Sequence, residues 1–152
     1  MARVEDVAAY ILATHGPMTA MKLQKLVYHS QAWHLVWDEQ ALFSEEIQAW
    51  ANGPVVPDLY RRHRGTFRVS TPAEIGGDPK ALTPPERETV DAVLGFYGDK
   101  SAHWLSELTH RERPWSEART KAGLAENERG DVVIEHAAMF EYYDGLTSSA
   151  TR

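Results

Sequence analysis

Apolar residues recur along most of the chain at spacings of three and four, which is typical of helices that bury one face. From Val4 to Ala13, for example, the apolar positions share one helical face. Capping signals support the pattern, because Thr19 and Ser101 can cap helices and Thr83 precedes Glu86 by three residues. The pattern predicts helices over about residues 4–13, 19–37, 57–64, 83–97 and 135–143, with shorter helices that begin at Ser101 and Pro114.

The second predicted helix has a different pattern from the others. Its later apolar residues, from Ala32 to Trp37, cover most of the circumference. A helix that is apolar nearly all round is buried on most of its sides. We therefore expect residues 19–37 to form the central helix of the fold.

The segments between the helices contain short apolar runs and turn residues. Residues 41–43 and 47–50 flank a polar turn and predict a small β-hairpin. Residues 66–82 lack a helical period and contain prolines and paired glycines, so they predict a long loop with an extended piece at 67–69. Val132–Ile134 predicts a further short strand.

These elements together predict a mainly α fold. We expect a single compact domain of six or seven helices around a central buried helix, with a small β-hairpin or short sheet element. A length of 152 residues suits one domain. We assign residues 1–146 to it and expect the polar residues 147–152 to form a flexible C-terminal tail.

The composition excludes several classes of function. The chain has 43% hydrophobic and 25% charged residues, as globular domains do, and no cysteine. Disulfide scaffolds, thiolate metal sites and thiol nucleophiles are therefore excluded. No apolar run reaches the roughly 20 residues of a membrane span, and the acidic start at Glu5 and Asp6 is unlike a signal peptide. We expect a cytoplasmic protein with no membrane association.

The net charge of −6 disfavours nucleic acid as a partner, because phosphate-binding proteins usually carry a basic excess. The only basic cluster consists of Arg61, Arg62, Arg64 and Arg68. It is either a solvated helix end, where cations complement the helix dipole, or a patch for an anion or an acidic partner. The first two helices also resemble a helix-turn-helix, but the second is too apolar to lie in a DNA groove. A DNA-binding regulator remains the alternative in this class.

A search for catalytic and metal-binding patterns finds little. The chain contains no glycine-rich phosphate loop and no nucleophile elbow. His29 and His34 are five residues apart, so they point about 140° apart around a helix and do not share a metal. Ser106, Thr109 and His110 could form a polar cluster, but no acidic residue or oxyanion hole completes it. We therefore expect that the protein is not an enzyme and has no metal site and no cofactor.

Three blocks of sequence carry a more specific signal. The first is Lys-Leu-Gln-Lys-Leu-Val-Tyr at residues 22–28. The second is Ala-Trp-Ala-Asn-Gly-Pro-Val-Val-Pro at residues 49–57, followed by Tyr60. The third is Leu-Ser-Glu-Leu-Thr-His at residues 105–110, followed by Pro114 and Trp115. In these blocks the chain resembles the Panacea domain of SocA-like and phage-associated GepA-like antitoxins, and the resemblance extends from about residue 4 to residue 143.

The resemblance implies a mostly helical antitoxin of a toxin–antitoxin pair that neutralises its toxin by direct protein–protein binding. The family is not known as an enzyme, and its toxins belong to unrelated families. The implied partner is a cognate toxin encoded by a neighbouring gene. An adaptor that delivers its partner to a protease is an alternative, because at least one member resembles one. The oligomeric state stays open, since an exposed partner surface can also self-associate.

Two roles are open for the motif residues. Conserved positions of a family with varied partners can be mainly structural, and we expect a scaffold role for Leu23, Leu26, Trp50, Gly53, Pro54 and Tyr60. The other motif residues could line a shared partner-binding groove: Lys22, Gln24, Lys25, Tyr28, Gln31, His110 and Trp115. Trp50 and Trp115 lie at element junctions, where tryptophan serves either core packing or protein recognition.

Overall fold

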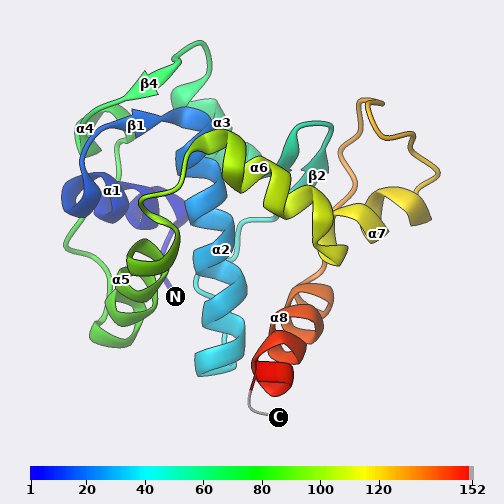
Figure 1. The fold of residues 1–152 in the computed structure, drawn as a ribbon. Helices are drawn as coiled ribbons and strands as arrows, with labels where there is room; N and C mark the ends of the chain where they lie inside the picture. The colour runs from blue at the N-terminus through cyan, green and yellow to red at the C-terminus, as the bar shows by residue number, and fades with distance from the viewer. Residues whose placement is uncertain (151–152) are drawn as a thin grey trace.

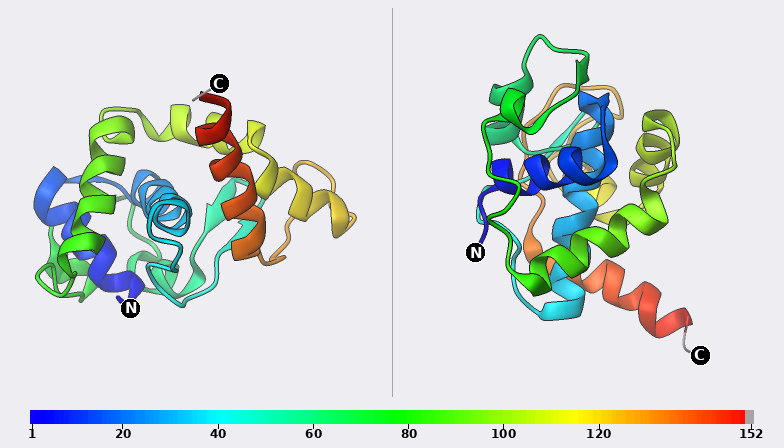
Figure 2. Two further views of the ribbon diagram at one scale, coloured as in Figure 1. Left: turned by 90° about the horizontal axis from the view of Figure 1, so that it is seen from below. Right: turned by 90° about the vertical axis from the view of Figure 1, so that its left-hand side faces the viewer.

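Helix α2 (Ala20–Asp38) runs through the middle of the structure, and the other elements pack around it. A computed structural model describes residues 1–150 of the chain. Figure 1 shows α2 upright in the centre, between α5 (Pro84–Tyr97) on one side and α8 (His136–Ala150) on the other. In the left panel of Figure 2, α2 is viewed along its axis and is surrounded by the other elements. The central helix predicted from the sequence is therefore confirmed.

The remaining elements are short. In chain order they are α1 (Val4–His15), β1 (Met18–Thr19), β2 (Gln48–Trp50), β3 (Gly53–Val55), α3 (Pro57–His63), β4 (Arg68–Val69), α4 (Pro72–Ile75), α6 (Ala102–Arg111) and α7 (Arg113–Lys121).

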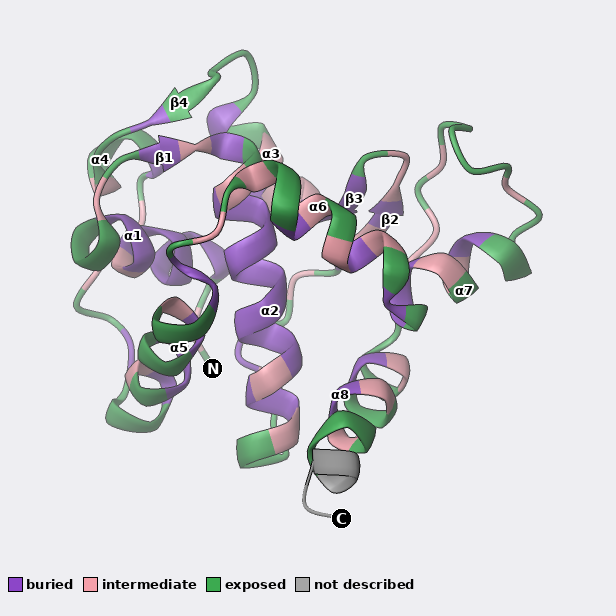
Figure 3. Cartoon of the chain, viewed as in Figure 1, coloured by how far each residue is buried: buried purple, intermediate pink, exposed green. Residues whose placement is uncertain are grey.

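Helix α2 is buried along most of its length, as Figure 3 shows. Its first turn is capped by Thr19, whose Oγ1 accepts a hydrogen bond from Lys22 N at 3.1 Å. Leu23 and Leu26 are fully buried and anchor the helix in the core. The C-terminal turn is open, because Trp37 is 47% exposed. The last turn is therefore less buried than the apolar pattern from Ala32 to Trp37 predicts.

The capping signals of the next helices are confirmed. Thr83 N donates to Glu86 Oε1 at 2.8 Å, and the Thr83 hydroxyl accepts from Glu86 N, which completes a capping box at the start of α5. Ser101 Oγ accepts from Trp104 N at 3.0 Å at the start of α6. These caps satisfy backbone N–H groups that have no partner within the helix.

The hairpin lies later in the chain than predicted. Strand β2 pairs antiparallel with β3, and Trp50 faces Gly53 across a two-residue turn. Residues 41–43 take no part in it, since Phe43 forms a bridge with Ala2 instead. The predicted pairing of residues 41–43 with 47–50 is therefore wrong. The positive φ of 124° at Gly53 closes the tight turn, a conformation that favours glycine.

Two segments outside the predicted helices also acquire structure. In the predicted loop 66–82, β4 pairs with β1, and Thr71 and Glu74 form a capping box that starts the four-residue helix α4. The described residues therefore contain eight helices instead of six or seven. The predicted strand at Val132–Ile134 forms a single bridge, between Val133 and Gln48. The predicted fold class, mainly α with short antiparallel sheet elements, is confirmed.

Helix α8 continues to Ala150, beyond the predicted end at residue 143. Residues 147–150 thus belong to a helix, and 151–152 lie outside the described residues, so a flexible tail stays a prediction. Among the described residues, no helix combines the length and the apolar character needed to cross a membrane.

Candidate functional site

A groove of about 1000 Å³ opens between the N-terminal half of α2, the β2–β3 hairpin and α3. Residues from four segments line it, within 19–25, 48–55, 60–67 and 129–131. The first two motif blocks and Tyr60 contribute residues to these walls. We call this concavity the motif groove.

The floor of the motif groove contains a buried lysine. Lys25 is 1% exposed, and its ammonium donates one hydrogen bond, to Pro54 O at 3.4 Å. The described residues form no ion pair with it, although carboxylates are common elsewhere on the chain. Burial lowers the pKa of Lys25 to about 8, because an apolar environment disfavours the charged form. The amine is still mainly protonated at neutral pH.

Gln24, beside Lys25, holds the backbone at Val56, where the chain leaves strand β3. Its amide oxygen accepts from Val56 N at 2.9 Å, and its Nε2 lies 3.3 Å from Val56 O. The same Nε2 is 3.0 Å from His63 Nε2 on α3. Burial lowers the pKa of His63, so the ring is neutral at pH 7. Gln24 therefore combines a scaffold role with a place in the groove wall.

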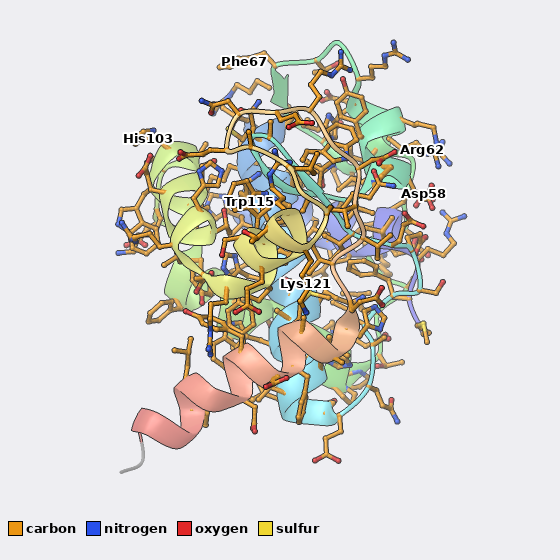
Figure 4. All side chains as sticks on the ribbon, turned by 90° about the vertical axis from the view of Figure 1, so that its right-hand side faces the viewer. Asp58, Arg62, Phe67, His103, Trp115 and Lys121 are labelled. Atoms are coloured by element: carbon orange, nitrogen blue, oxygen red, sulfur yellow. The ribbon has the colours of Figure 1, made fainter. Side chains whose placement is uncertain are left out.

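Aromatic side chains form one wall and part of the rim. Trp50 and Tyr60 meet edge to face with ring centroids 5.1 Å apart, and Tyr60 packs in the same way on His63. On the rim, Phe67 is 83% exposed and Met21 is 44% exposed. Figure 4 shows Phe67 projecting from the top of the molecule. The rim thus presents apolar side chains that the fold leaves uncovered.

The third motif block lies behind the hairpin. The ring of His110 stacks on Trp115 at 4.2 Å, and Trp115 Nε1 donates to Trp50 O at 2.8 Å. The guanidinium of Arg119 lies 5.3 Å from the centroid of the Trp115 ring and donates to Ala49 O at 2.8 Å. His110 Nε2 is buried and has no hydrogen-bond partner among the described residues. Trp115 is buried, so it supports the groove instead of lining it.

Three other candidate partner residues lie away from the groove. Gln31 is buried and bridges the backbone of Leu42 and Phe43. Tyr28 is buried, and its hydroxyl oxygen lies 3.2 Å from the hydroxyl oxygen of Tyr143. Lys22 is half-buried and donates to Gly98 O at the end of α5.

The Tyr28 region is a separate buried polar cluster. Tyr143 Oη donates to Glu112 Oε1 at 2.7 Å, and His29 Nε2 lies 3.5 Å from the same oxygen. Burial raises the pKa of both tyrosines above the ordinary value, so their hydroxyls stay protonated. The cluster joins α2 to α8 and to the α6–α7 junction, which is a structural task.

The arginine cluster does not line the groove. Arg61 pairs with Asp58 on α3, and Arg62 lies 3.7 Å from Glu5 of α1. Figure 4 shows Arg62 and Asp58 at the outer edge of the molecule. Arg64 and Arg68 are exposed. The arginine that lines the groove is Arg129, in a segment for which the sequence offered no signal.

The polar residues of the third block do not form a nucleophilic arrangement. Thr109 Oγ1 donates to Ser106 O at 2.9 Å, and Ser106 Oγ contacts Met21 Sδ. The His110 ring faces Trp115. His29 and His34 have different polar partners: His29 Nε2 lies 3.5 Å from Glu112 Oε1, whereas His34 Nδ1 lies 2.7 Å from Thr89 Oγ1. In the part of the chain that the structure describes, no group of three His, Asp or Glu side chains could hold a metal.

A second concavity, of about 680 Å³, lies between α2, α5, α6 and α8. It is mostly apolar and is lined by Trp33, Trp37, Phe96, Trp104 and Leu146 among others. We call it the aromatic groove. Leu108 is its one lining residue from the three motif blocks.

Sequence reasoning missed several residues of the motif groove. His63 lies within the sequence of the arginine cluster but is not among its predicted site residues, and Phe67 lies in the segment predicted to be a loop. An exposed aromatic residue beside a basic helix end is a weak signal that could have pointed to Phe67. His63 and Arg129 had no such signal, because their places depend on tertiary packing.

Comparison with known protein families gives one match. The family model described as antitoxin SocA-like, Panacea domain, matches residues 23–116, more than half of the chain. The matched range contains all three motif blocks apart from Lys22. No curated protein and no solved structure matches the chain.

Proposed function

The chain belongs to the family of SocA-like antitoxins with a Panacea domain, and from this premise we propose that it neutralises a cognate toxin by direct protein–protein binding at the motif groove. The observation that carries the proposal is the convergence of separate motif blocks. Residues of the first block, the second block and Tyr60 line one concavity. Shared residues around a shared groove suit a binding function that the family has in common.

The chemistry of the groove supports a protein as the partner. Trp, Tyr and Arg dominate the binding energy of protein interfaces, and they work best in pockets surrounded by apolar contacts. Trp50, Tyr60 and Arg129 line the groove, and Met21 and Phe67 extend its apolar rim. The aromatic groove contributes only Leu108 from the motif blocks, so we do not assign the toxin to it.

The proposal assigns the chain no catalytic role, and it places the complex in the cytoplasm. The contacts of Ser106, Thr109 and His110 support the first point, because none of them activates a hydroxyl. Against a DNA-binding role, the helix that would enter a groove is the buried helix α2. Delivery of the toxin to a protease is compatible with the same binding step and would follow it.

The test is the growth of a host that expresses the neighbouring gene, with and without this chain. We expect arrest by the neighbour alone and rescue on co-expression, with the two purified proteins eluting as one stoichiometric complex. A harmless neighbour, or rescue without co-elution, would contradict neutralisation by binding. A salt-dependent shift of promoter DNA, lost when Arg61, Arg62 and Arg64 are neutralised, would favour the regulator instead.

Matched rim variants locate the binding site. Phe67→Asp adds a charge to the exposed rim of the motif groove, whereas Phe96→Asp adds one to the aromatic groove, where Phe96 is 65% exposed. We expect Phe67→Asp to lose co-elution and Phe96→Asp to retain it. The reverse result would move the toxin to the aromatic groove.

A further inference from the structure

The Lys25 ammonium is a buried charge that the fold leaves largely without partners. An ammonium has three N–H donors, and the structure provides one acceptor, Pro54 O at 3.4 Å, which is long for a hydrogen bond. Buried charges are normally paired, because an unpaired charge in an apolar site is costly. Lys25 is also one of the residues that line the motif groove, so its buried side chain borders the space that a ligand would enter.

The side chains near Lys25 leave its positive charge uncompensated, because burial is the cause of its lowered pKa and no described carboxylate pairs with it. His110 on α6 is close enough that the positive charge of Lys25 contributes, after burial, to lowering its pKa. His110 Nε2 is itself buried and without a partner among the described residues. Arg129 stands on the groove wall and Asp131 is the one acidic residue lining it. The Lys25 ammonium and His110 Nε2 are therefore poorly satisfied polar groups near each other, and of these two Lys25 is the one that lines the groove.

We propose that the motif groove receives a carboxylate of the bound toxin, and that the Lys25 ammonium pairs with it. The inference rests on the proposed antitoxin function and names the chemistry of its site. A carboxylate supplies two acceptor oxygens for the free N–H donors of Lys25 and cancels its single charge. Charge-assisted hydrogen bonds of this kind are about twice as strong as neutral ones. The lysine is already desolvated in the fold, so it is preorganised for an anion.

A carboxylate fits the site better than a phosphate does. A phosphate monoester carries about two negative charges at neutral pH and is typically bound by forked arginines or by several donors. The buried floor offers one positive charge, and Arg129 is exposed. The charge of the site therefore matches one carboxylate.

The first test is titration calorimetry of the purified neighbouring-gene toxin with wild-type protein and with Lys25→Met. Loss of one member of a buried charged pair weakens binding by about 30-fold or more, and we expect that loss. Lys22→Met is the matched control, because it removes the same charge from the same helix but outside the groove. We expect its affinity to stay within about threefold of wild type, the range of surface changes.

A second measurement needs no substitution. The wild-type affinity should be constant near pH 7 and fall above about pH 8, where free Lys25 loses its proton. The groups that face this region from the packed elements are His63, His110, Glu107, Glu126, Arg129 and Asp131. Burial lowers the pKa of His63 and of His110 from the ordinary value, so both rings are already neutral where this window begins.

Changes in the toxin identify the source of the carboxylate. If adding three residues to the C-terminus of the toxin abolishes binding, the C-terminal carboxylate is the ligand. If the extension is tolerated and one Asp→Asn or Glu→Gln change matches the loss in Lys25→Met, a side chain is the ligand. If neither change weakens binding, the carboxylate proposal is overturned.

The outcomes separate the two proposals. A wild-type protein that fails to bind the toxin refutes the antitoxin function itself. If wild type and folded Lys25→Met bind with equal affinity, and the affinity is constant from pH 7 to 9.5, the antitoxin function is supported and the proposed role of Lys25 is refuted.

Discussion

Gly53 and Lys25 fit together as a pair. A Cβ atom on residue 53 would lie 2.8 Å from Lys25 Cε and 3.0 Å from Lys25 Nζ. The turn of the second motif block therefore lies directly on the lysine of the first block. This contact explains why a glycine stands here, in addition to its positive φ of 124°.

The contact between Gly53 and Lys25 predicts that Gly53→Ala destabilises the fold. The added methyl group is strained at positive φ and collides with Lys25, so we expect the free energy of unfolding to fall by about 2–4 kcal/mol. Urea denaturation measures this change. Gly65→Ala is the control, because Gly65 has a φ of +82° but open space around its Cβ position; it isolates the backbone strain, about 1–2 kcal/mol.

The contact itself is tested by a double-mutant cycle. Lys25→Ala removes the atoms that the new methyl group meets, so Gly53→Ala should cost less in that background. Equal costs of Gly53→Ala in both backgrounds would show that the contact contributes nothing.

The buried lysine also predicts a change of stability with pH. Its pKa is about 8 in the fold and 10.5 in the unfolded chain, so between these values the unfolded state holds the additional proton. The stability contributed by this group therefore rises from pH 8 to pH 10.5, by up to about 3 kcal/mol. The measurement is the difference in unfolding free energy between wild type and Lys25→Met at pH 7 and pH 10.5.

The direction of this change matters for the binding data. Stability rises over the pH range in which toxin affinity is expected to fall, so weaker binding does not result from unfolding. At pH 7 we expect Lys25→Met to be at least as stable as wild type, since it removes a buried charge. A marked loss of stability in this variant would mean that the ammonium holds the fold together.

Substitution of Gln31 should destabilise the fold, in contrast to Lys25→Met, because the hydrogen bonds of Gln31 are all within the protein. Leu42 N donates to Gln31 Oε1 at 2.7 Å, and Gln31 Nε2 donates to Phe43 O at 2.8 Å. Gln31→Leu leaves both backbone groups buried without partners, and we expect a loss of about 2–4 kcal/mol in unfolding free energy. The exposed control, Gln40→Leu, should stay within about 0.5 kcal/mol.

The same variant separates scaffold from binding site. At a temperature where Gln31→Leu is still folded, its affinity for the toxin should equal that of wild type. A weaker complex without a loss of stability would return Gln31 to the set of partner-binding residues.

Sequence patterns were sufficient for most of the helices, although not for α4, and insufficient for the hairpin. Thr19, Thr83 and Ser101 bond to backbone N–H groups in the next turn of the chain, so the local sequence is enough to predict these caps. The predicted partner of residues 47–50 was wrong because Phe43 bridges to Ala2, near the start of the chain, and this long-range pairing is not visible in the local pattern. The Asn52–Gly53 step was a usable signal for the turn, because this dipeptide favours tight hairpins.

The motif groove was only partly predictable for a similar reason. Polar residues on a helix normally face solvent, so the pattern gave no reason to bury Gln24, Lys25 and Gln31. Each is held by a backbone group from another element, such as Val56 for Gln24. Which polar residue faces the groove and which faces the core is decided by these tertiary contacts, and a one-dimensional pattern does not contain them.

Hydrogen–deuterium exchange of the protein, with and without the bound toxin, tests the central claim most directly. The account predicts that the toxin slows exchange in residues 48–55 and 60–67, which line the motif groove. Residues 92–97 of α5, at the aromatic groove, should be unaffected. Protection confined to α5 and α8, with no change at the hairpin, would contradict binding at the motif groove.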